Sequence, residues 1–261
     1  MNALPVALSI AGSDSGGGAG VQADLLTFAA NGVFGTTAIT CLTAQNPDGV
    51  SGVVAIAPEF VAVQALQVFR FFEVRAVKTG MLFNAPIIAA VAGLLRERRE
   101  LPLVVDPVMV ATSGATLLQP DAVEAVCDQL FPLAALVTPN LDEAAVMLGR
   151  RPGDEAEMRI AALELARRFA VPFLLKGGHL GGEALVDVLG LPDGSTEHWV
   201  GSRIAGVDTH GSGCTLSAAI AAHLALGRPL VEAVGAGRDY LRRGLERGVA
   251  LRGRKFIAHL V

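Results

Sequence analysis

The sequence has few of the residues that mark disulfide-bonded, metal-binding or secreted proteins. Its 261 residues contain three cysteines, one tryptophan and one tyrosine. Cys41, Cys127 and Cys214 are far apart and lack the paired spacing of a metal site, which favours a reduced, cytoplasmic protein. The N-terminus also lacks a charged segment followed by a long apolar run, so we expect no secretion signal.

Positive charge and long apolar runs are also scarce. Lysine and arginine number 21 against 25 acidic residues, and no basic cluster is interleaved with aromatic residues. The basic residues between 238 and 255 are spaced as a solvated helix face and tail. No stretch approaches the roughly 18 apolar residues that would indicate a membrane span. We therefore expect neither nucleic acid nor a membrane as a partner.

What the sequence does contain is alternating strand and helix patterns in a chain that is 52% hydrophobic. Its short apolar runs are typical of strands buried on both faces, which predicts an α/β fold with a mostly parallel sheet covered by helices. Residues 183–200 predict a β-hairpin at one edge of the sheet. We expect one domain over residues 1–261. Strands are expected at 5–10, 34–43, 74–79, 101–106, 135–138 and 172–176, and helices at 21–30, 58–72, 85–99, 121–130, 141–148, 155–169 and 229–247.

A further helix is expected to begin directly after a small-residue loop and to end near Leu226. The loop, Asp208-Thr209-His210-Gly211-Ser212-Gly213, places Cys214 in the first helical turn. Glycines allow the backbone to approach a ligand closely, and the first N–H groups of a helix have no partner within it. The segment therefore predicts an anion-binding site, although a tight turn with a structural cysteine is an alternative.

Polar residues follow each of the six expected parallel strands. Ligands of open α/β sheets bind beyond the carboxyl ends of the strands, so we expect these residues to line one crevice. Each has a structural alternative: Asn140 as a helix N-cap with Glu143, Asp106 as a loop cap, and Lys176 as a solubilising residue on an edge strand. The set consists of Gly12, Asp14, Gln45, Lys78, Thr79, Gly80, Met81, Asp106, Pro107, Thr138, Pro139, Asn140, Lys176, Gly177, Gly178 and His179.

A dinucleotide site is a weak alternative. Residues 18–23 satisfy the loose pattern G-x-G-x-x-A, but Gln45 and Asn46 stand where a ribose-binding acid is expected. The sequence also lacks a P-loop lysine motif. A phosphate-handling role must therefore depend on the helix start at residues 211–214.

Phosphoryl transfer requires mainly positioning and charge neutralisation, with a base near the attacking hydroxyl. Residues 211–214 offer the anion hole and Lys176 a cation, while Glu143 with Asn140 and Asp106 offers a metal shell. Cys214 is a candidate base, with a pKa that the helix N-terminus is expected to lower. Covalent catalysis by Cys214 with His210 or His179 is a competing hypothesis.

Six motifs together resemble the hydroxymethylpyrimidine/phosphomethylpyrimidine kinases of thiamine biosynthesis. The resemblance covers nearly the whole chain, and Gly-Ser-Gly-Cys is close to the Gly-Thr-Gly-Cys of that family, where most ribokinase-like enzymes carry an aspartate base. The motifs are residues 7–24 (ALSIAGSDSGGGAGVQAD), 43–46 (TAQN), 78–81 (KTGM), 105–109 (VDPVM), 138–144 (TPNLDEA) and 208–215 (DTHGSGCT).

The resemblance implies a three-layer ribokinase-like fold and a homodimer. It implies that MgATP phosphorylates the hydroxymethyl group of 4-amino-5-hydroxymethyl-2-methylpyrimidine and then the monophosphate. Cys214 is implied as the base, with Lys176 and the amides of Gly211 and Gly213 at the transferred charge. The implied pyrimidine site is Gly12, Asp24, Gln45, Met81 and Val108; the implied nucleotide site is Asp106, Asn140, Glu143, Lys176 and Thr209, with Glu143 and Asp106 toward magnesium.

The sequence departs from the family pattern at three places. Ser212 replaces the commoner threonine, Thr112 stands where many members have lysine, and residues 248–261 lack the usual histidine motifs. Thr112 bears most on the second phosphorylation, which must accommodate an extra phosphate. A weakly catalytic ligand-binding protein on the same fold therefore stays open as an alternative. A pyridoxal kinase is the other alternative, since pyridoxine-type rings carry a similar hydroxymethyl group and some relatives with Cys at this position phosphorylate them.

Overall fold

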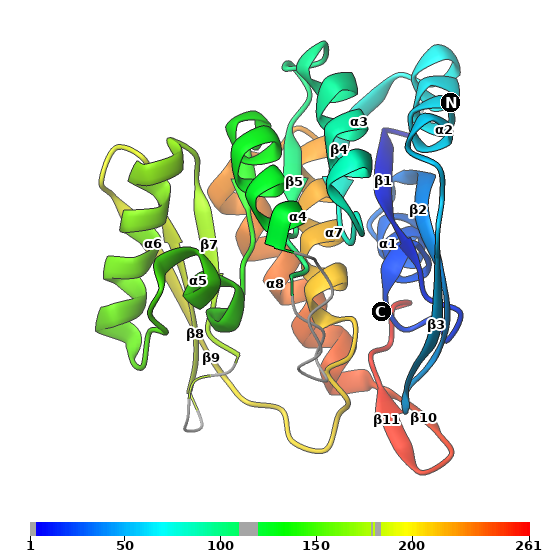
Figure 1. The fold of residues 1–261 in the computed structure, drawn as a ribbon. Coiled ribbons are helices and arrows are strands. Elements are labelled where there is room, and N and C mark those ends of the chain that lie inside the picture. The colour runs from blue at the N-terminus through cyan, green and yellow to red at the C-terminus, as the bar shows by residue number, and fades with distance from the viewer. Residues whose placement is uncertain (1–3, 110–119, 179, 181–183) are drawn as a thin grey trace.

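A nine-stranded sheet forms the middle layer of the molecule (Figure 1). The structure is a computed structural model and describes residues 4–109, 120–178, 180 and 184–261. The strand order is β3-β2-β1-β4-β5-β6-β7-β8-β9, in which β3, β8 and β9 are antiparallel to their neighbours and the other six strands are parallel. The strands are β1 (Val6–Ser13), β2 (Phe34–Asn46), β3 (Gly49–Ala55), β4 (Val74–Thr79), β5 (Leu103–Val105), β6 (Leu136–Val137), β7 (Phe173–Lys176), β8 (Ala184–Gly190) and β9 (Thr196–Ser202).

Helices cover both faces of this sheet, and each face has its own apolar core. One core includes Val61 of α2, Ile87 of α3 and Leu165 of α6; the other includes Phe28 of α1 and Ile220 of α7. Figure 1 shows α7 and α8 behind the sheet, opposite α3 and α4. The predicted three-layer α/β fold is confirmed. The helices are α1 (Gly20–Ala30), α2 (Pro58–Phe71), α3 (Ala85–Arg96), α4 (Pro120–Ala125), α5 (Leu141–Leu148), α6 (Glu155–Phe169), α7 (Ser212–Ala225) and α8 (Leu230–Arg247), with a π turn at Val126–Leu130 and a 3₁₀ turn at Phe131–Leu133.

Helix α7 is the most enclosed helix, and its sequence explains why. Nearly all of its residues are small or apolar, and ten of its fourteen are buried. A Cβ on Gly237 of α8 would lie 2.8 Å from Cγ1 of Ile220, so the absence of a side chain there lets the two helices pack closely. This packing fixes the N-terminus of α7 against the edge of the sheet.

Two strand predictions need correction at the β1–β2 side of the sheet. Residues 11–13 continue β1, although the glycine-rich segment predicts irregular structure, because Ala11 and Ser13 still pair with β2. Residues 49–55 form β3, which the turn signals before it concealed. Its β-branched residues pair with β2 through contacts such as Leu42 with Val54.

The C-terminal residues form a second small sheet that the sequence patterns did not predict. Strands β10 (Val249–Leu251) and β11 (Arg254–Phe256) make an antiparallel hairpin. The carbonyl of Lys255 accepts a hydrogen bond of 2.7 Å from Asp208 N, and Arg254 forms an ion pair of 2.7 Å with Asp48. The hairpin therefore braces the loop before α7. The predicted hairpin at β8–β9 is confirmed as well.

Among the described residues, no helix has both the length and the apolar character that crossing a membrane requires.

Candidate active site

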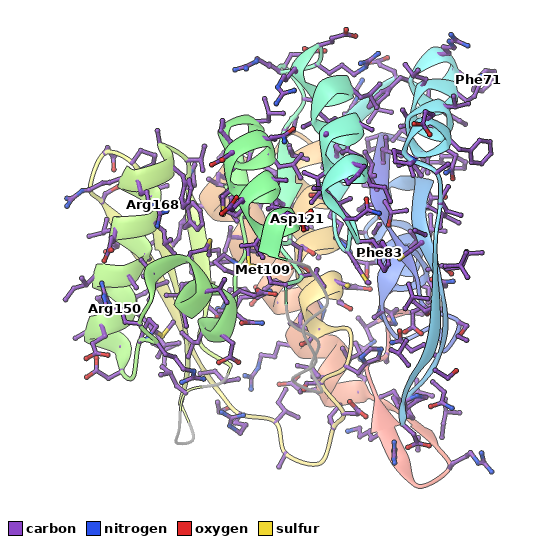
Figure 2. The ribbon with its side chains drawn as sticks, viewed as in Figure 1. Phe71, Phe83, Met109, Asp121, Arg150 and Arg168 are labelled. Atoms are coloured by element: carbon purple, nitrogen blue, oxygen red, sulfur yellow. The ribbon has the colours of Figure 1, made fainter. Side chains whose placement is uncertain are left out.

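The carboxyl ends of the six parallel strands meet at one edge of the sheet, as predicted. The N-terminus of α7 lies over this edge, where its Gly213 faces Asp106 after β5 and Lys176 at the end of β7. Figure 2 shows Met109, which follows β5, between that strand and α5. The backbone N–H of Met109 donates to Glu143 Oε1 at 3.3 Å, which joins α5 to the same edge.

The start of α7 depends on two glycines. Gly211 is the N-cap with φ 79°, and a Cβ there would lie 1.8 Å from the carbonyl oxygen of Gly18. A Cβ on Gly213 would lie 3.3 Å from Lys176 Nζ and 3.5 Å from Asp106 Oδ2. The backbone of this first turn therefore approaches both charged groups directly. Its N–H groups favour an anion at this position.

Lys176 and Asp106 form an ion pair below that turn. Their Nζ and Oδ1 atoms are 3.1 Å apart, and the Asp106 side chain is 3% exposed. Ser217 Oγ donates to Asp106 Oδ2 at 3.2 Å, so the carboxylate is also tied to α7. Burial opposes the charge of Lys176, but Asp106 and Glu143 together raise its pKa. Lys176 lies on an interior strand, so its interpretation as an edge-strand solubiliser is wrong.

Asn140 and Glu143 begin α5 with a capping box. The Asn140 side chain accepts from the N–H groups of Asp142 and Glu143, and Glu143 Oε2 accepts from Asn140 N at 2.7 Å. The capping interpretation is thus confirmed. Burial raises the pKa of the Glu143 carboxyl, although Lys176 opposes the shift.

Metal binding by this region stays a prediction. Over residues 4–109, 120–178, 180 and 184–261, no three His, Cys, Asp or Glu side chains converge as a metal-binding group. Asp106 and Glu143 offer carboxylate oxygens beside Lys176 near the α7 N-terminus. One or two carboxylates completed by substrate phosphates are an ordinary Mg²⁺ environment, so the donor set fits that ion.

Cys214 lies in the first turn of α7, but its acidity is opposite to the prediction. Burial raises the pKa of its thiol to about 11, against the lowering effects of the Lys78 charge and a hydrogen bond from the Gly20 backbone. The predicted low pKa is therefore wrong, because desolvation of a thiolate outweighs the field of the helix N-terminus.

A buried ion pair between β4 and α1 acts on Cys214. Lys78 Nζ is 2.8 Å from both oxygens of Asp24, and both side chains are fully buried. Ser9 Oγ donates to Asp24 Oδ2 at 2.5 Å. Burial opposes the ammonium, yet the Asp24 charge raises the pKa of Lys78.

The sequence identified Asp24 as a substrate ligand and missed this pair. In the structure, the Asp24 carboxylate is occupied by Lys78 and Ser9, so direct contact with substrate stays a prediction without support from these contacts. The available signal was Lys78 itself, a lysine that directly follows two buried apolar residues of β4.

A polar cluster joins Gln45, His210 and Asp14. His210 Nε2 lies 3.0 Å from Asp14 Oδ2 and 3.2 Å from Gln45 Nε2. Asp14 also accepts hydrogen bonds from the backbone N–H groups of Gly16 and Ala19. The cluster connects the glycine loop, the end of β2 and the loop before α7.

These contacts bear on the covalent hypothesis. The His210 imidazole is engaged by Asp14 and Gln45, and the described part of the chain contains no hydrogen bond from it to Cys214. His179 lies outside the described residues. Covalent catalysis therefore has no oriented base among the described side chains.

The remaining predicted site residues lie around this edge. A Cβ on Gly12 would lie 3.8 Å from Met81 Cβ, so these two are neighbours. Val108, after β5, has φ 26°, an unusual value for a β-branched residue. Thr209 is exposed, and its carbonyl accepts from Ser212 N at 3.0 Å. Thr112 lies outside the described residues.

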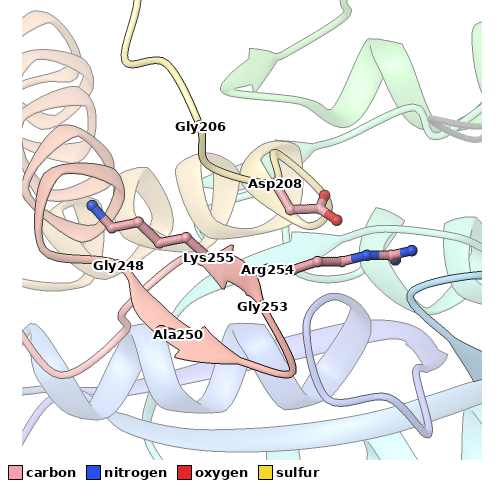
Figure 3. A pocket seen from close by; sticks show the side chains of 7 residues that line it. All are labelled: Gly206, Asp208, Gly248, Ala250, Gly253, Arg254 and Lys255. Atoms are coloured by element: carbon pink, nitrogen blue, oxygen red, sulfur yellow. The ribbon is translucent and has the colours of Figure 1, made fainter.

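An open pocket of about 450 Å³ lies between the loop before α7 and the C-terminal hairpin (Figure 3). Its two cations already have partners, because Arg254 pairs with Asp48 and Lys255 Nζ donates to the Glu246 carbonyl. We interpret this pocket as a gap where the β10–β11 hairpin packs against the loop before α7, rather than as a ligand site. Its lining residues are Gly206, Asp208, Gly248, Ala250, Gly253, Arg254 and Lys255.

Comparison with known proteins agrees with this geometry. The family described as phosphomethylpyrimidine kinase matches residues 14–258. A hydroxymethylpyrimidine/phosphomethylpyrimidine kinase from Rhizobium meliloti is 53% identical over 242 residues, which are 92% of this chain and 90% of the relative.

Two solved structures are similar over almost the whole chain. Phosphomethylpyrimidine kinase from Clostridium difficile 630 has a TM-score of 0.80 and 40% identity, covering 91% of this chain and 98% of that one. An ADP complex of Bacillus subtilis pyridoxal kinase has a TM-score of 0.90 and 35% identity, covering 98% of each chain. With a family match over most of its length and relatives well above 30% identity, the chain belongs to the phosphomethylpyrimidine kinase family.

Proposed function

We propose that this chain, as a single kinase domain over residues 1–261, uses MgATP to phosphorylate 4-amino-5-hydroxymethyl-2-methylpyrimidine and then its monophosphate. The proposal depends chiefly on the close approach of Gly213 to Lys176 and Asp106. A Cβ on this glycine would lie 3.3 Å from Lys176 Nζ and 3.5 Å from Asp106 Oδ2. An anion-binding helix start, a cation and a carboxylate are the parts that phosphoryl transfer requires. Relatives of the chain carry this activity in their names.

In this proposal the nucleotide binds on one side of the α7 N-terminus and the pyrimidine on the other. Lys176, at the end of β7, neutralises charge on the transferred phosphoryl group, and the N–H groups of Gly211 and Gly213 hold its oxygens. Asn140 and Thr209 contribute to the nucleotide side. The pyrimidine lies on the opposite side, against Gly12, Gln45, Met81 and Val108, with Asp24 beneath.

ATP as the phosphoryl donor is supported by the ADP complex of the similar pyridoxal kinase. Asp106 and Glu143 would hold Mg²⁺ together with the phosphates, and that ion supplies neutralisation of the developing phosphate charge. The pair already tolerates a nearby cation, since both carboxylates act on Lys176. Each carboxylate oxygen of Glu143 has a second lone pair besides the one that accepts a backbone hydrogen bond. Magnesium bound at that second lone pair would leave the capping box of α5 intact.

Cys214 is proposed as the group that receives the hydroxyl proton. A thiol with a pKa of about 11 is protonated at neutral pH in the free protein. The base role therefore requires the thiolate to form in the substrate complex, where Lys78 is the charge that favours it. Phosphoryl transfer through a loose transition state needs little help from a base, so loss of the thiol should slow rather than abolish the reaction.

A homodimer and a cytoplasmic location are part of the proposal. The outer strand β3 is an exposed edge, and Leu42 and Val54, paired across β2 and β3, are 47% and 64% exposed. Phe60 on α2 is 58% exposed as well. An apolar sheet edge of this kind is typical of a surface that is covered by another chain.

Pyridoxal phosphorylation is the second candidate function. Its support is the TM-score of 0.90 to Bacillus subtilis pyridoxal kinase. A pyridoxine-type ring carries a similar hydroxymethyl group. Gln45 favours the aminopyrimidine, because a carboxamide both donates to and accepts from an amino-substituted ring edge.

ADP release distinguishes these functions. We would measure it with hydroxymethylpyrimidine, its monophosphate and pyridoxal, for the native protein, Cys214→Ala and the matched control Cys127→Ala. We expect turnover of both pyrimidines, a slower Cys214→Ala variant and an unchanged control. No turnover of any acceptor contradicts the kinase proposal, and a fully active Cys214→Ala variant removes the thiol as base.

A further inference from the structure

The backbone of Gln45 is fixed on both its donor and its acceptor side. Its backbone N–H donates to Ser15 Oγ at 2.8 Å, and the same hydroxyl donates to the Gln45 carbonyl at 2.7 Å. The end of β2 is thereby pinned to the glycine loop. What Gln45 presents to a ligand then depends on which amide atom faces His210.

His210 Nε2 lies between two partners with different hydrogen-bonding capacity: the Asp14 carboxylate and the Gln45 amide. Asp14 Oδ2, at 3.0 Å, can only accept a hydrogen bond while the carboxyl is ionised. Burial alone would raise the pKa of Asp14, but hydrogen bonds from His210 and Gly16 lower it. Asp14 is therefore ionised. His210 Nε2 must then carry a proton and donate it in the hydrogen bond to Asp14.

A protonated Nε2 cannot accept a hydrogen bond from the Gln45 NH₂ group. The two amide positions of glutamine have nearly the same shape, so a half-turn of the amide exchanges oxygen and nitrogen at no steric cost. With Oε1 at the 3.2 Å position, one Nε2–H can serve both Asp14 and Gln45. Hydrogen-bond chemistry therefore selects this orientation.

The His210 imidazole is held in one position, so it can determine the orientation of the Gln45 amide. A Cβ on Gly18 would lie 3.1 Å from His210 Cδ2, so the glycine loop packs against the ring. His210 N donates to Asp208 Oδ1 at 2.9 Å, which fixes the backbone behind the ring. Asp14 and Asp208 are the charged groups that act on the imidazole, and the hydrogen bond that Asp14 accepts from it is the main cause of the raised pKa of His210.

We propose that His210, held by Asp14, fixes the Gln45 amide with Oε1 toward the imidazole, so that the site selects a ring edge that donates a hydrogen bond beside His210. An amino group on the ring meets the second lone pair of Oε1, and a neighbouring ring nitrogen accepts from the amide N–H. A ring with an oxo oxygen in place of the amino group brings two acceptor oxygens together, and its neighbouring ring nitrogen carries a proton that faces the amide N–H. His210 is thus a positioning residue for specificity, and this inference rests on the proposed function through the role of Gln45.

The test compares two ligands that differ at this ring edge, where the 4-oxo analogue exchanges the donor and acceptor positions of the amino compound. We would measure binding by calorimetry, and KM and kcat by ADP release, for the 4-amino pyrimidine alcohol and for its 4-oxo analogue. One hydrogen bond exchanged for a repulsive contact corresponds to a preference of about tenfold or more for the amino compound. The protein variants are His210→Leu, His210→Gln, Gln45→Ala and the double variant of His210→Leu with Gln45→Ala.

His210→Leu should raise KM for the amino compound about tenfold, leave kcat within about twofold, and bring the amino-to-oxo preference close to one. His210→Gln should restore most of the preference, because its side-chain N–H₂ can reach the position of Nε2. In the Gln45→Ala background, His210→Leu should have no further effect on the preference.

Three results would overturn the inference: an unchanged preference in His210→Leu, an equal loss in the Gln45→Ala background, or no rescue by His210→Gln in a folded protein. Each of these leaves the kinase function standing if the native protein still turns over the amino compound. A native protein that neither binds nor phosphorylates the amino compound would instead contradict the proposed function and the inference together.

Discussion

At the scale of single residues, the site contains two lysines that differ in exposure and in partners, and therefore in their expected roles. Lys176 keeps 15% of its side chain exposed and faces the first turn of α7, whereas Lys78 is fully buried against Asp24. A cation that must meet a phosphate has to remain accessible. We therefore propose Lys176 as the residue at the transferred charge, while Lys78 pairs with Asp24 and exerts its field on Cys214.

Replacing Lys176 by methionine should remove charge stabilisation that is strongest in the transition state. Comparable electrostatic groups contribute about 10²–10³-fold to kcat. Steady-state kinetics with saturating ATP would measure the loss. Lys255→Met is the matched control, since its Nζ donates to the Glu246 carbonyl at the surface. An active Lys176→Met variant would exclude the proposed role.

The high pKa of Cys214 predicts slow alkylation of the free protein at neutral pH. Its reaction with iodoacetamide, followed by peptide mass spectrometry, should accelerate as pH rises toward about 11, because only the thiolate reacts. Replacing the pair together, as Lys78→Met with Asp24→Asn, avoids leaving an unpaired buried charge and should slow alkylation further. A midpoint below pH 8 in the native protein would contradict the burial argument.

At the scale of elements, the glycine loop and the start of α7 form one unit. Gly18 touches both Gly211 and His210, and Gly20 donates to the sulfur of Cys214. The capping box of α5 and the C-terminal hairpin hold the neighbouring segments. The predicted anion site is thus built from backbone that several elements fix, which is the condition for preorganised charge stabilisation.

Gly211→Ala should disrupt that unit. The left-handed backbone costs an alanine about 1–2 kcal/mol, and its Cβ would in addition overlap the Gly18 carbonyl at 1.8 Å. Gly227→Ala is the matched control, because φ is +82° there but the space is open. Thermal unfolding should show a clearly larger loss for Gly211→Ala, accompanied by loss of activity. Equal losses would mean that the close approach to Gly18 is unimportant.

At the scale of the whole molecule, two apolar cores hold a sheet whose polar edge is assembled from six strand ends. The site is therefore a consequence of the topology: residues as distant as Asp14 and His210 meet because β1 lies in the middle of the sheet beneath α7. Conditions that change their charges act on the stability of the whole fold.

The His210–Asp14 pair predicts a pH-dependent term in stability. Because its hydrogen bond to Asp14 raises the pKa of His210, the stabilisation is fully present below the unfolded value of about 6.5 and is lost as pH rises through the higher folded pKa. Urea unfolding of native protein and Asp14→Asn at pH 6 and pH 9 measures it. The difference between the two proteins should shrink at pH 9; a constant difference would exclude the coupling.

The exposed β2–β3 face predicts a dimer that a charge can dissociate. Val54→Lys should lower the mass measured by light scattering toward that of one chain, because Val54 is 64% exposed beside Leu42. Val200→Lys on β9, where Val200 is 62% exposed, is the control at the opposite edge of the sheet. Monomeric native protein, or dissociation by both variants, would contradict the proposed interface.

Much of this architecture could be predicted, because buried parallel strands and helix periodicity leave clear patterns. Helix α6 has the predicted bounds, and the polar strand ends converge as expected. Strand β3 was missed because turn residues precede it. The acidity of Cys214 and the Lys78–Asp24 pair could not be predicted, since both depend on burial between segments far apart in the chain.

The central claim is transfer of phosphate from ATP to a pyrimidine alcohol, and phosphorus NMR tests it most directly. Native protein with ATP, Mg²⁺ and 4-amino-5-hydroxymethyl-2-methylpyrimidine should produce the monophosphate resonance first and the diphosphate resonance later, while Lys176→Met produces neither at a comparable rate. Consumption of ATP without a phosphorylated pyrimidine, or phosphorylation of pyridoxal alone, would contradict the account.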